Sequence, residues 1–261
     1  MAIPSNHPKV TLYWLNESRA HRVLWLLEEL KIPYELKTFK RGADKLAPKP
    51  LRDIHPLGKA PIVTIETPNL DSDSPLVLAE SAFIVEYFLD HFGGSHLIPK
   101  RWKDGQEGKV GGESEEWLRY RYYLHYTEGS LMPNLVMKVV TNVLRTAPPL
   151  IVRGIFSFVA SKIEENFLTR NFADHFDFLE NQLRTAPGGG IYLTGPQLTA
   201  ADIMMSYPVI ESMTRVIGVQ RGFERDKYPR IKAYAEKLQE SDGYKRAVGK
   251  IVEVTGEFVA C

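Results

Sequence analysis

Two short segments in the first third of the chain carry residues that could bind a peptide. Ala60-Pro61 precedes a β-branched run from Ile62, and proline is tolerated at the first residue of a strand. If the Ala60–Pro61 bond were cis, the Ala60 backbone N–H and C=O would face outward and could pair with another peptide. Glu80-Ser81 stands where an apolar helix should begin, and N–H groups at a helix start attract a carboxylate. The two segments predict a groove for a short peptide with a free carboxylate, but a hairpin followed by a helix explains the same residues.

The elements that would position these segments follow from the spacing of apolar residues. Residues 19–30 place apolar side chains at helical spacing after Ser18, a suitable cap. Residues 40–53 are basic, contain two prolines and predict a short irregular helix. Polar residues 67–75 predict a hairpin loop. Strands are predicted over 10–15, 34–39, 62–65 and 76–78, with a further helix from Ser81. This order predicts an α/β domain over residues 1–92.

Three segments together resemble one known family. They are SRAHRVLWLLEELKIPYE (residues 18–35), HPLGKAPIV (55–63) and AES (79–81). With the order of elements, they resemble the thioredoxin-like N-terminal domain of cytosolic glutathione transferases, and the first two resemble the fungal and bacterial GTT-type branch. The resemblance covers nearly the whole chain. It implies a thioredoxin-like α/β domain followed by an all-α domain, glutathione as co-substrate, a homodimer and a cytoplasmic location.

The resemblance also implies a group that activates the glutathione thiol. A hydroxyl donor together with the start of the helix over 19–30 would favour the thiolate over the thiol. Ser18 is the preferred candidate, although it would serve equally as a simple helix cap. Tyr13, near the end of the first strand, is the alternative, because YWLNESRA aligns with the tyrosine-class pattern, and Asn16 is third. Cysteine is absent from this segment, which argues against the deglutathionylating classes.

Further residues are assigned to the tripeptide by the resemblance. Ala60 would pair through its backbone with the cysteinyl unit, with Pro61 cis. Glu80 and Ser81 would hold the ammonium and carboxylate of the γ-glutamyl end. The cation that meets the glycyl carboxylate would be Lys59, with Lys40 and Arg41 as the alternative. Solvated surface charge explains these lysines equally well.

The second half of the chain reads as helical. Residues 93–112 are rich in glycine and charge and predict a linker with a helical turn around Trp102. Residues 113–261 predict an all-helical domain that carries the hydrophobic substrate site. Its first helix contains an aromatic run, which is commonly core or interface. The resemblance places this helix beside the thiol, which makes Tyr122, His125 and Tyr126 candidates to contact an electrophile.

Two other features of this half stand out. Residues 141–167 form an apolar insertion interrupted by Pro148-Pro149. It would be a lid or extra core, or residues 150–160 would contact a membrane surface or a partner. Thr199 and Asp202 form a capping box before an apolar helix, in which Thr199 would cap the N–H groups and Asp202 would reach back. Its role is predicted to be structural.

Composition narrows the remaining classes of function. The chain has 261 residues, 33 basic against 32 acidic residues and one cysteine, Cys261. We therefore expect no nucleic-acid partner, no disulfide framework and no metal site, and the residues before Val10 show no targeting signal. The predicted reaction is attack of the glutathione thiolate on hydrophobic electrophiles. A glutathione-dependent peroxidase and a non-catalytic glutathione-binding regulatory module remain alternatives, and the missing C-x-x-C disfavours a disulfide reductase.

Overall fold

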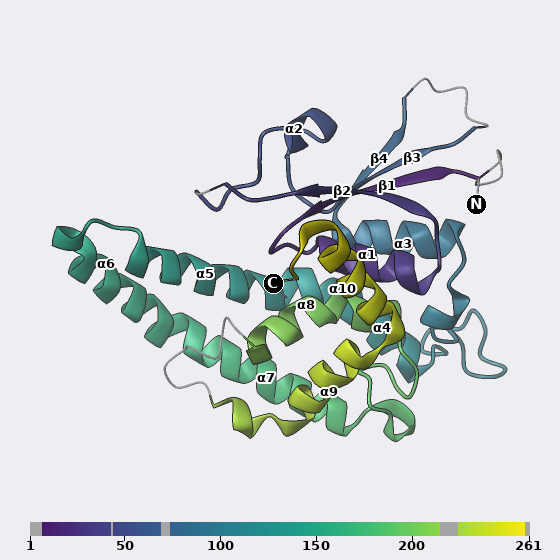
Figure 1. The fold of residues 1–261 in the computed structure, drawn as a ribbon. Coiled ribbons are helices and arrows are strands. Elements are labelled where there is room, and N and C mark those ends of the chain that lie inside the picture. Colours follow the sequence, from purple (N-terminus) through teal and green to yellow (C-terminus); the bar gives the residue numbers. More distant parts are fainter. Residues whose placement is uncertain (1–6, 43, 69–73, 215–223, 259–261) are drawn as a thin grey trace. The chain divides into compact units, whose positions relative to one another are not determined.

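The computed structural model describes residues 7–42, 44–68, 74–214 and 224–258 (Figure 1). The chain forms two compact units, one made of Met1–Leu97 with Gln239–Cys261 and the other of Ile98–Leu238. The sequence predicted a single helical domain over residues 113–261. The structure instead groups the last helix, α10 (Asp242–Thr255), with the N-terminal unit, because it packs against α1 (Ala20–Glu29).

A four-stranded sheet forms the centre of the first unit. Its strand order is β2-β1-β3-β4, with β1 parallel to β2 and the other pairs antiparallel. The strands are β1 (Lys9–Leu15), β2 (Tyr34–Phe39), β3 (Ile62–Glu66) and β4 (Leu76–Ala79). These bounds agree with the predicted strands to within one residue. The predicted hairpin loop falls partly outside the described residues.

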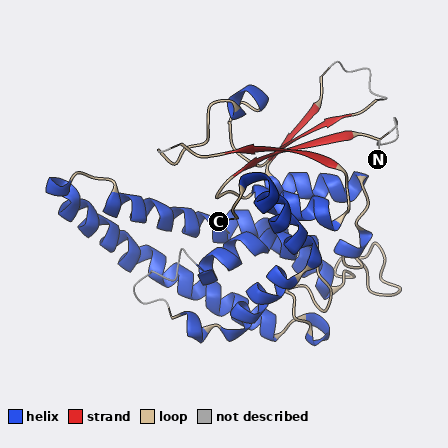
Figure 2. Ribbon diagram, in the orientation of Figure 1, coloured by secondary structure: helices blue, strands red, loops and turns tan. Residues whose placement is uncertain are grey.

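Helices cover both faces of this sheet (Figure 2). The helices α1 and α3 (Ser81–His91) lie together on one face, and α2 (Leu51–Ile54) lies on the other. The eight α1 residues from Ala20 to Leu27 are all buried, since the helix is enclosed by the sheet, α3 and α10. The irregular helix predicted over 40–53 is reduced to the single turn of α2. A small cluster of Leu15, Leu51 and Ile62 packs beneath that turn.

Close packing of α10 on α1 depends on a glycine. A Cβ at Gly243 would lie 2.0 Å from Glu29 Oε2 and 2.8 Å from Trp25 Nε1, so a larger residue would push the helices apart. The Trp25 ring also meets Tyr244 edge to face, with centroids 5.3 Å apart. Arg246 donates from Nη2 to the Glu28 carbonyl at 2.9 Å. These contacts explain why the last helix belongs to this unit.

The second unit is helical. It contains α4 (Glu115–Tyr126), α5 (Met132–Thr146), α6 (Leu150–Ile163), α7 (Thr169–Arg184), α8 (Ala200–Thr214) and most of α9 (Pro229–Glu240). Short helical turns lie at η4 (Pro187–Gly189) and η6 (Arg225–Lys227). The predicted turn around Trp102 is not formed. Trp102 instead pairs in an isolated bridge with Glu113, and the 3₁₀ turn η1 (Ser95–Leu97) belongs to the first unit.

Two π-helical turns join helices of this unit end to end. The turn η2 (Thr127–Leu131) joins α4 to α5, and η3 (Glu164–Leu168) joins α6 to α7. Pro148-Pro149 separates α5 from α6, as the sequence predicted, because proline has no backbone N–H to continue the hydrogen bonds of α5. The helices α5 and α6 run side by side and extend as an arm from the other helices of the unit (Figure 1).

Candidate active site

The strand pairing brings the predicted peptide-binding residues of the first unit to one edge of its sheet. Tyr13 of β1 pairs with Ile62 of β3, and Ile62 pairs with Ala79 of β4. Leu15, Ala60 and Ser81 each lie two positions beyond these paired residues, at the same end of the sheet. This edge is where β1 ends, β3 begins and β4 ends, so segments far apart in the sequence meet there.

Two helices also begin at this edge, since α1 follows β1 and α3 follows β4 directly. The first N–H groups of each helix have no partner within the helix, and the helix dipole is positive at that end. An anion is therefore favoured at both positions. This edge is therefore suited to a ligand that carries more than one negative charge.

Ser18 lies between β1 and α1 and is buried. Its hydroxyl donates to the Leu15 carbonyl at 2.7 Å and accepts from the Ala20 N–H at 3.2 Å. The N-cap position of α1 is Arg19, so Ser18 lies one residue before the cap position expected for it, although its oxygen still accepts from the first helical N–H. The hydrogen bond to Leu15 also joins the start of α1 to the end of β1.

Tyr13 lies two residues before the end of β1 and points to the face of the sheet that α2 covers. Its ring packs against the Leu15 cluster, and the Phe39 ring lies 6.4 Å away between centroids. The Thr64 hydroxyl donates to the Tyr13 oxygen at 3.5 Å. Tyr13 is half-buried, so its position is compatible with either a core role or a site role.

Asn16, the third candidate, holds the loop after β2. Its Oδ1 accepts from the Arg41 N–H at 2.8 Å, and its carbonyl accepts from Arg41 Nε at 3.2 Å. The same guanidinium donates to the carbonyls of Glu17 and Lys45, each at 3.0 Å. Arg41, a predicted carboxylate partner, is thus engaged with the backbone.

The Ala60–Pro61 peptide bond is cis, as the resemblance implied. Pro61 is buried, Ala60 is half-buried and packs on the Leu15 cluster, and Lys59 beside it is exposed. Lys40 is exposed as well. Lys59, the first predicted partner of the glycyl carboxylate, therefore directly precedes Ala60 in the sequence and has its side chain in solvent.

Glu80 and Ser81 mark the start of α3. Glu80 has a φ of 72° and is exposed, whereas Ser81 is buried. Arg22 of α1, a fully buried residue, approaches the Ser81 Oγ with its Nη1 at 3.5 Å. Arg22 was not among the site residues predicted from the sequence. A charged residue inside an otherwise apolar helix was the signal that could have found it.

His21 was also missed, and it is buried beside Arg22 in the first turn of α1. Its ring lies 5.0 Å from Tyr244 and 4.8 Å from Phe258, measured between centroids. Among the described residues, neither ring nitrogen has a hydrogen-bond partner. Burial lowers the pKa of His21 to about 3, so the ring is neutral and adds no charge at the helix start.

The residues predicted to contact an electrophile lie in the second unit, on α4. Tyr122 is half-exposed and stacks on Tyr126 with centroids 5.4 Å apart. Tyr126 is buried, and its hydroxyl forms a 2.7 Å hydrogen bond with His175 Nδ1. Phe178 packs on both tyrosines. His125 is exposed and is not brought together with this cluster by any contact in the described part of the chain.

The capping box forms with one difference from the expectation. The Asp202 carboxylate accepts from the Thr199 N–H at 2.9 Å, as predicted, and from the Tyr234 hydroxyl at 2.7 Å. The Thr199 hydroxyl donates to that carboxylate at 2.7 Å, so it binds Asp202 of the first helical turn instead of accepting from helix N–H groups. Burial raises the pKa of Asp202, and these hydrogen bonds partly oppose the rise.

Within the described residues, no three His, Cys, Asp or Glu side chains gather in a way that could hold a metal ion. None of the helices in that part of the chain combines the length and apolar character needed to cross a bilayer.

Models of two protein-family domains match this chain. Residues 18–91 match the N-terminal domain of glutathione S-transferases, and residues 163–237 match the C-terminal domain. The first match contains Ser18, Ala60 and Ser81, and the second contains the capping box.

Whole-chain comparisons agree with these matches. Glutathione S-transferase 1 of Saccharomyces cerevisiae is 32% identical to this chain, and the alignment spans 96% of this chain and 99% of that protein. Glutathione S-transferase 3 of Schizosaccharomyces pombe is 29% identical, with 94% of this chain and 89% of that protein aligned. A solved glutathione S-transferase from Actinobacillus pleuropneumoniae, 26% identical, superposes with a TM-score of 0.66 over 92% of each chain. The chain therefore belongs to the glutathione S-transferase family, with fungal relatives of the GTT type that the sequence resembles, and it is a glutathione transferase.

Proposed function

We propose that the sheet edge formed by Leu15, Ala60 and Ser81 binds glutathione and that the enzyme transfers its thiolate sulfur to hydrophobic electrophiles. One observation carries this proposal most: β1 ends, β3 begins and β4 ends at one edge of the sheet, and α1 and α3 both begin there. The backbone of Ala60 pairs with the cysteinyl unit. Ser81 and Glu80 hold the γ-glutamyl carboxylate and ammonium, and Lys59 meets the glycyl carboxylate.

Binding in this way brings the sulfur to the start of α1. The thiol of a free cysteinyl group has a pKa of ~8.5, so most of it is protonated at neutral pH. We assign the Ser18 hydroxyl as the donor that stabilises the thiolate, in exchange for its bond to the Leu15 carbonyl, since a charged acceptor binds a donor more strongly. Tyr13 and then Asn16 are the alternatives. The anion attacks the electrophilic carbon, the carbon–sulfur bond forms, and the leaving group departs with its electron pair.

The acceptor is proposed to be an apolar electrophile. The chain's aromatic residues Tyr122 and Tyr126, with the exposed His125 on the same helix, are the proposed contacts for it. A structural relative from Phanerochaete chrysosporium, Ure2p5, was crystallised with 1-(S-glutathionyl)-2,4-dinitrobenzene, an aryl conjugate of glutathione. That relative is 16% identical with a TM-score of 0.66, so its ligand suggests a substrate to try rather than a known one.

The setting of this activity is proposed from composition and family. One cysteine in 261 residues suits a reducing compartment such as the cytoplasm. From the family, we expect the protein to remove toxic electrophiles. We also expect it to assemble as a homodimer. We propose residues 1–92 as the glutathione-binding domain, 93–112 as the linker and 113–261 as the substrate-binding domain, whose last helix, α10, is part of the first compact unit.

Calorimetric titration with glutathione, followed by assays with 1-chloro-2,4-dinitrobenzene and with an organic hydroperoxide, tests the proposal. We expect binding, conjugation of the aryl halide, and a KM for glutathione about tenfold higher in Ser81→Ala, because a hydrogen bond to a charged group is lost. Ser95→Ala, at an exposed serine of the same unit, is the matched control. Turnover of the hydroperoxide alone would identify a peroxidase, and binding without turnover would identify a regulatory module.

A further inference from the structure

The turn between β1 and α1 presents Ser18, and an arginine from another loop binds this turn. Arg41 follows the end of β2, and each of its three side-chain nitrogens donates to a different backbone carbonyl. Nε donates to the Asn16 carbonyl at 3.2 Å, Nη2 to the Glu17 carbonyl at 3.0 Å and Nη1 to the Lys45 carbonyl at 3.0 Å. The Arg41 backbone N–H also donates to Asn16 Oδ1 at 2.8 Å. We call Arg41 with these three carbonyls the Arg41 clamp.

The Arg41 clamp binds the peptide group that joins Glu17 to Ser18. The Glu17 carbonyl belongs to that planar group, so its hydrogen bond to Arg41 Nη2 fixes the orientation of the backbone entering Ser18. At the other end of the turn, the Asn16 N–H donates to the Phe39 carbonyl at 3.2 Å, which continues the pairing of β1 with β2. The direction of the Ser18 hydroxyl therefore depends on backbone that Arg41 holds.

Glu17 has a backbone conformation that glutamate rarely adopts. Its φ is 48°, in the left-handed region where the Cβ comes too close to the following carbonyl oxygen. Lys45, whose carbonyl the same guanidinium binds, has a φ of 63°. Residues other than glycine keep such conformations only where the surrounding structure holds them, and they are common at active sites. The hydrogen bonds of the Arg41 clamp hold this turn against its tendency to relax.

The whole guanidinium group of Arg41 is engaged with these carbonyls. Binding three separate acceptors suits the planar, forked guanidinium, whereas the ammonium of a lysine is a single nitrogen. We propose that Arg41 is a positioning residue for the reaction: it fixes the turn so that the Ser18 hydroxyl points toward the sulfur of bound glutathione. This inference rests on the proposed function, in which Ser18 donates to the thiolate. Arg41 then acts through Ser18 and does not bind the glycyl carboxylate.

Titration of the thiolate absorbance in enzyme saturated with glutathione tests this role. Arg41→Met should raise the midpoint by about one pH unit, because a misdirected hydrogen bond to a charged group is weakened. Arg41→Lys keeps the charge but concentrates it on one nitrogen, so it should raise the midpoint nearly as much. Arg52→Met, at an exposed arginine of the same unit, is the matched control and should leave the midpoint unchanged.

Two double variants separate positioning from other roles of Arg41. Arg41→Met/Glu17→Gly should recover about half of the rise in the midpoint, because glycine adopts a positive φ without strain and the turn then needs less support. A direct effect of the arginine charge on the sulfur would not be recovered in this way. Arg41→Met added to Ser18→Ala should raise the midpoint no further, since no hydroxyl remains to be directed.

Three outcomes would overturn the positioning role and leave the proposed function standing. The first is an unchanged midpoint in Arg41→Met where Ser18→Ala raises it. The second is an unchanged midpoint with a higher KM for glutathione, which would show that Arg41 binds a carboxylate. The third is a natural midpoint in Arg41→Lys, which would make charge the cause. The absence of a thiolate band in the natural chain would instead refute the proposed function, and the positioning role with it.

Discussion

The hydroxyl proton of Ser18 goes to the Leu15 carbonyl, while its oxygen accepts from the Ala20 N–H. A serine that only capped α1 would keep both bonds whatever was bound. A serine that activates a thiol must instead break its hydrogen bond to the Leu15 carbonyl and donate to the sulfur. Both roles use the same atom at the same place, so substitution alone does not separate them and a readout of the sulfur's ionisation is needed.

Ser18→Ala should shift the pH profile of kcat/KM for aryl conjugation. The apparent pKa of the thiol should rise by about one to two units, since a hydrogen bond to a charged group contributes ~1.5–3 kcal/mol. Ser18→Thr keeps the hydroxyl and should restore most of the profile. Tyr13→Phe should shift the profile less, and if it instead abolishes activity while Ser18→Ala leaves the profile in place, Tyr13 is the activating residue.

At the scale of elements, α1 connects the site to the rest of its unit. Its first turn supplies the helix start beside Ser18 and places His21 and Arg22 in the interior, and the helix packs on α10. The neutral His21, enclosed by Tyr244 and Phe258, ties the stability of this helix to pH. The sign follows from its lowered pKa: the folded protein binds fewer protons than the unfolded chain between about pH 6.5 and pH 3.

Acidification from pH 7 to pH 5 should therefore destabilise the protein through His21. The unfolded ring takes up a proton that the folded ring excludes, so the loss should be about 2 kcal/mol of unfolding free energy. Urea unfolding at both pH values measures it, and His21→Leu should remove that part of the pH dependence. His96→Leu, at an exposed histidine, is the control. If the natural chain and His21→Leu lose equal stability, His21 is protonated in the folded state.

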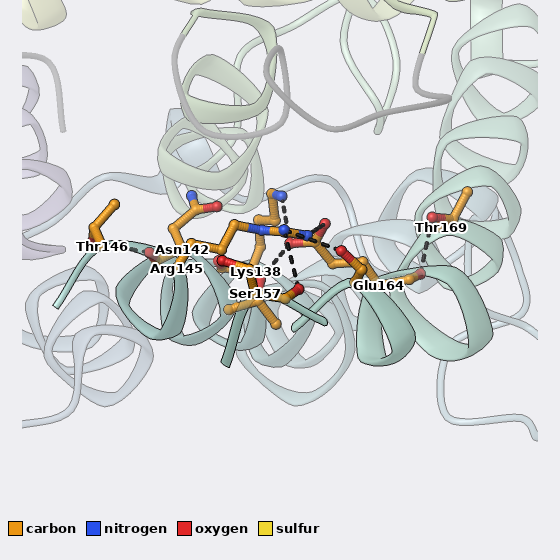
Figure 3. A network of polar contacts seen from close by, with 9 residues as sticks. Lys138, Asn142, Arg145, Thr146, Ser157, Glu164 and Thr169 are labelled. Carbon is orange, nitrogen blue, oxygen red and sulfur yellow. Dashed lines mark hydrogen bonds and ion pairs between the residues drawn. The ribbon is translucent and has the colours of Figure 1, made fainter. Parts of the chain in front are cut away.

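The ion pairs of Lys138 and Arg145 with Glu164, at the seam between α5 and α6, make a separate prediction (Figure 3). Burial alone raises the pKa of Glu164, but hydrogen bonds from Lys138, Thr141 and Arg145 outweigh it and leave the pKa lowered. Glu164→Gln leaves the buried Lys138 without a counter-charge, which should cost about 3–5 kcal/mol in urea unfolding. Glu165→Gln, which removes an exposed pair with Lys162, should cost less than about 1 kcal/mol. Similar costs for the two variants would show that the seam does not stabilise the arm.

At the scale of the whole molecule, local patterns predicted most of the fold. Alternation and helical periodicity located the four strands and the main helices. The prolines at 148 and 149 correctly predicted the break between α5 and α6. The assignment of α10 to the N-terminal unit was missed, because it depends on the fit of Gly243 against Trp25, a contact between residues more than 200 positions apart.

The site was predicted less completely than the fold. Pairs of adjacent residues such as Ala60-Pro61 and Glu80-Ser81 are visible in the sequence, and the strand registers then bring them to one edge. The position of Arg22 beside Ser81 arises from the packing of α1 on α3, so periodicity could not show it. The engagement of Arg41 by the backbone around Asn16 depends on a loop conformation that composition does not specify. The choice among Ser18, Tyr13 and Asn16 stays a prediction.

The ultraviolet absorbance of the thiolate, recorded while glutathione is titrated into the enzyme, tests the central claim most directly. That claim is that glutathione bound at the sheet edge is held as an anion beside α1. We predict a thiolate band at neutral pH whose midpoint lies well below the ~8.5 of a free thiol. Saturable binding without that band until the pH approaches 8.5, or no binding at millimolar glutathione, would contradict the account.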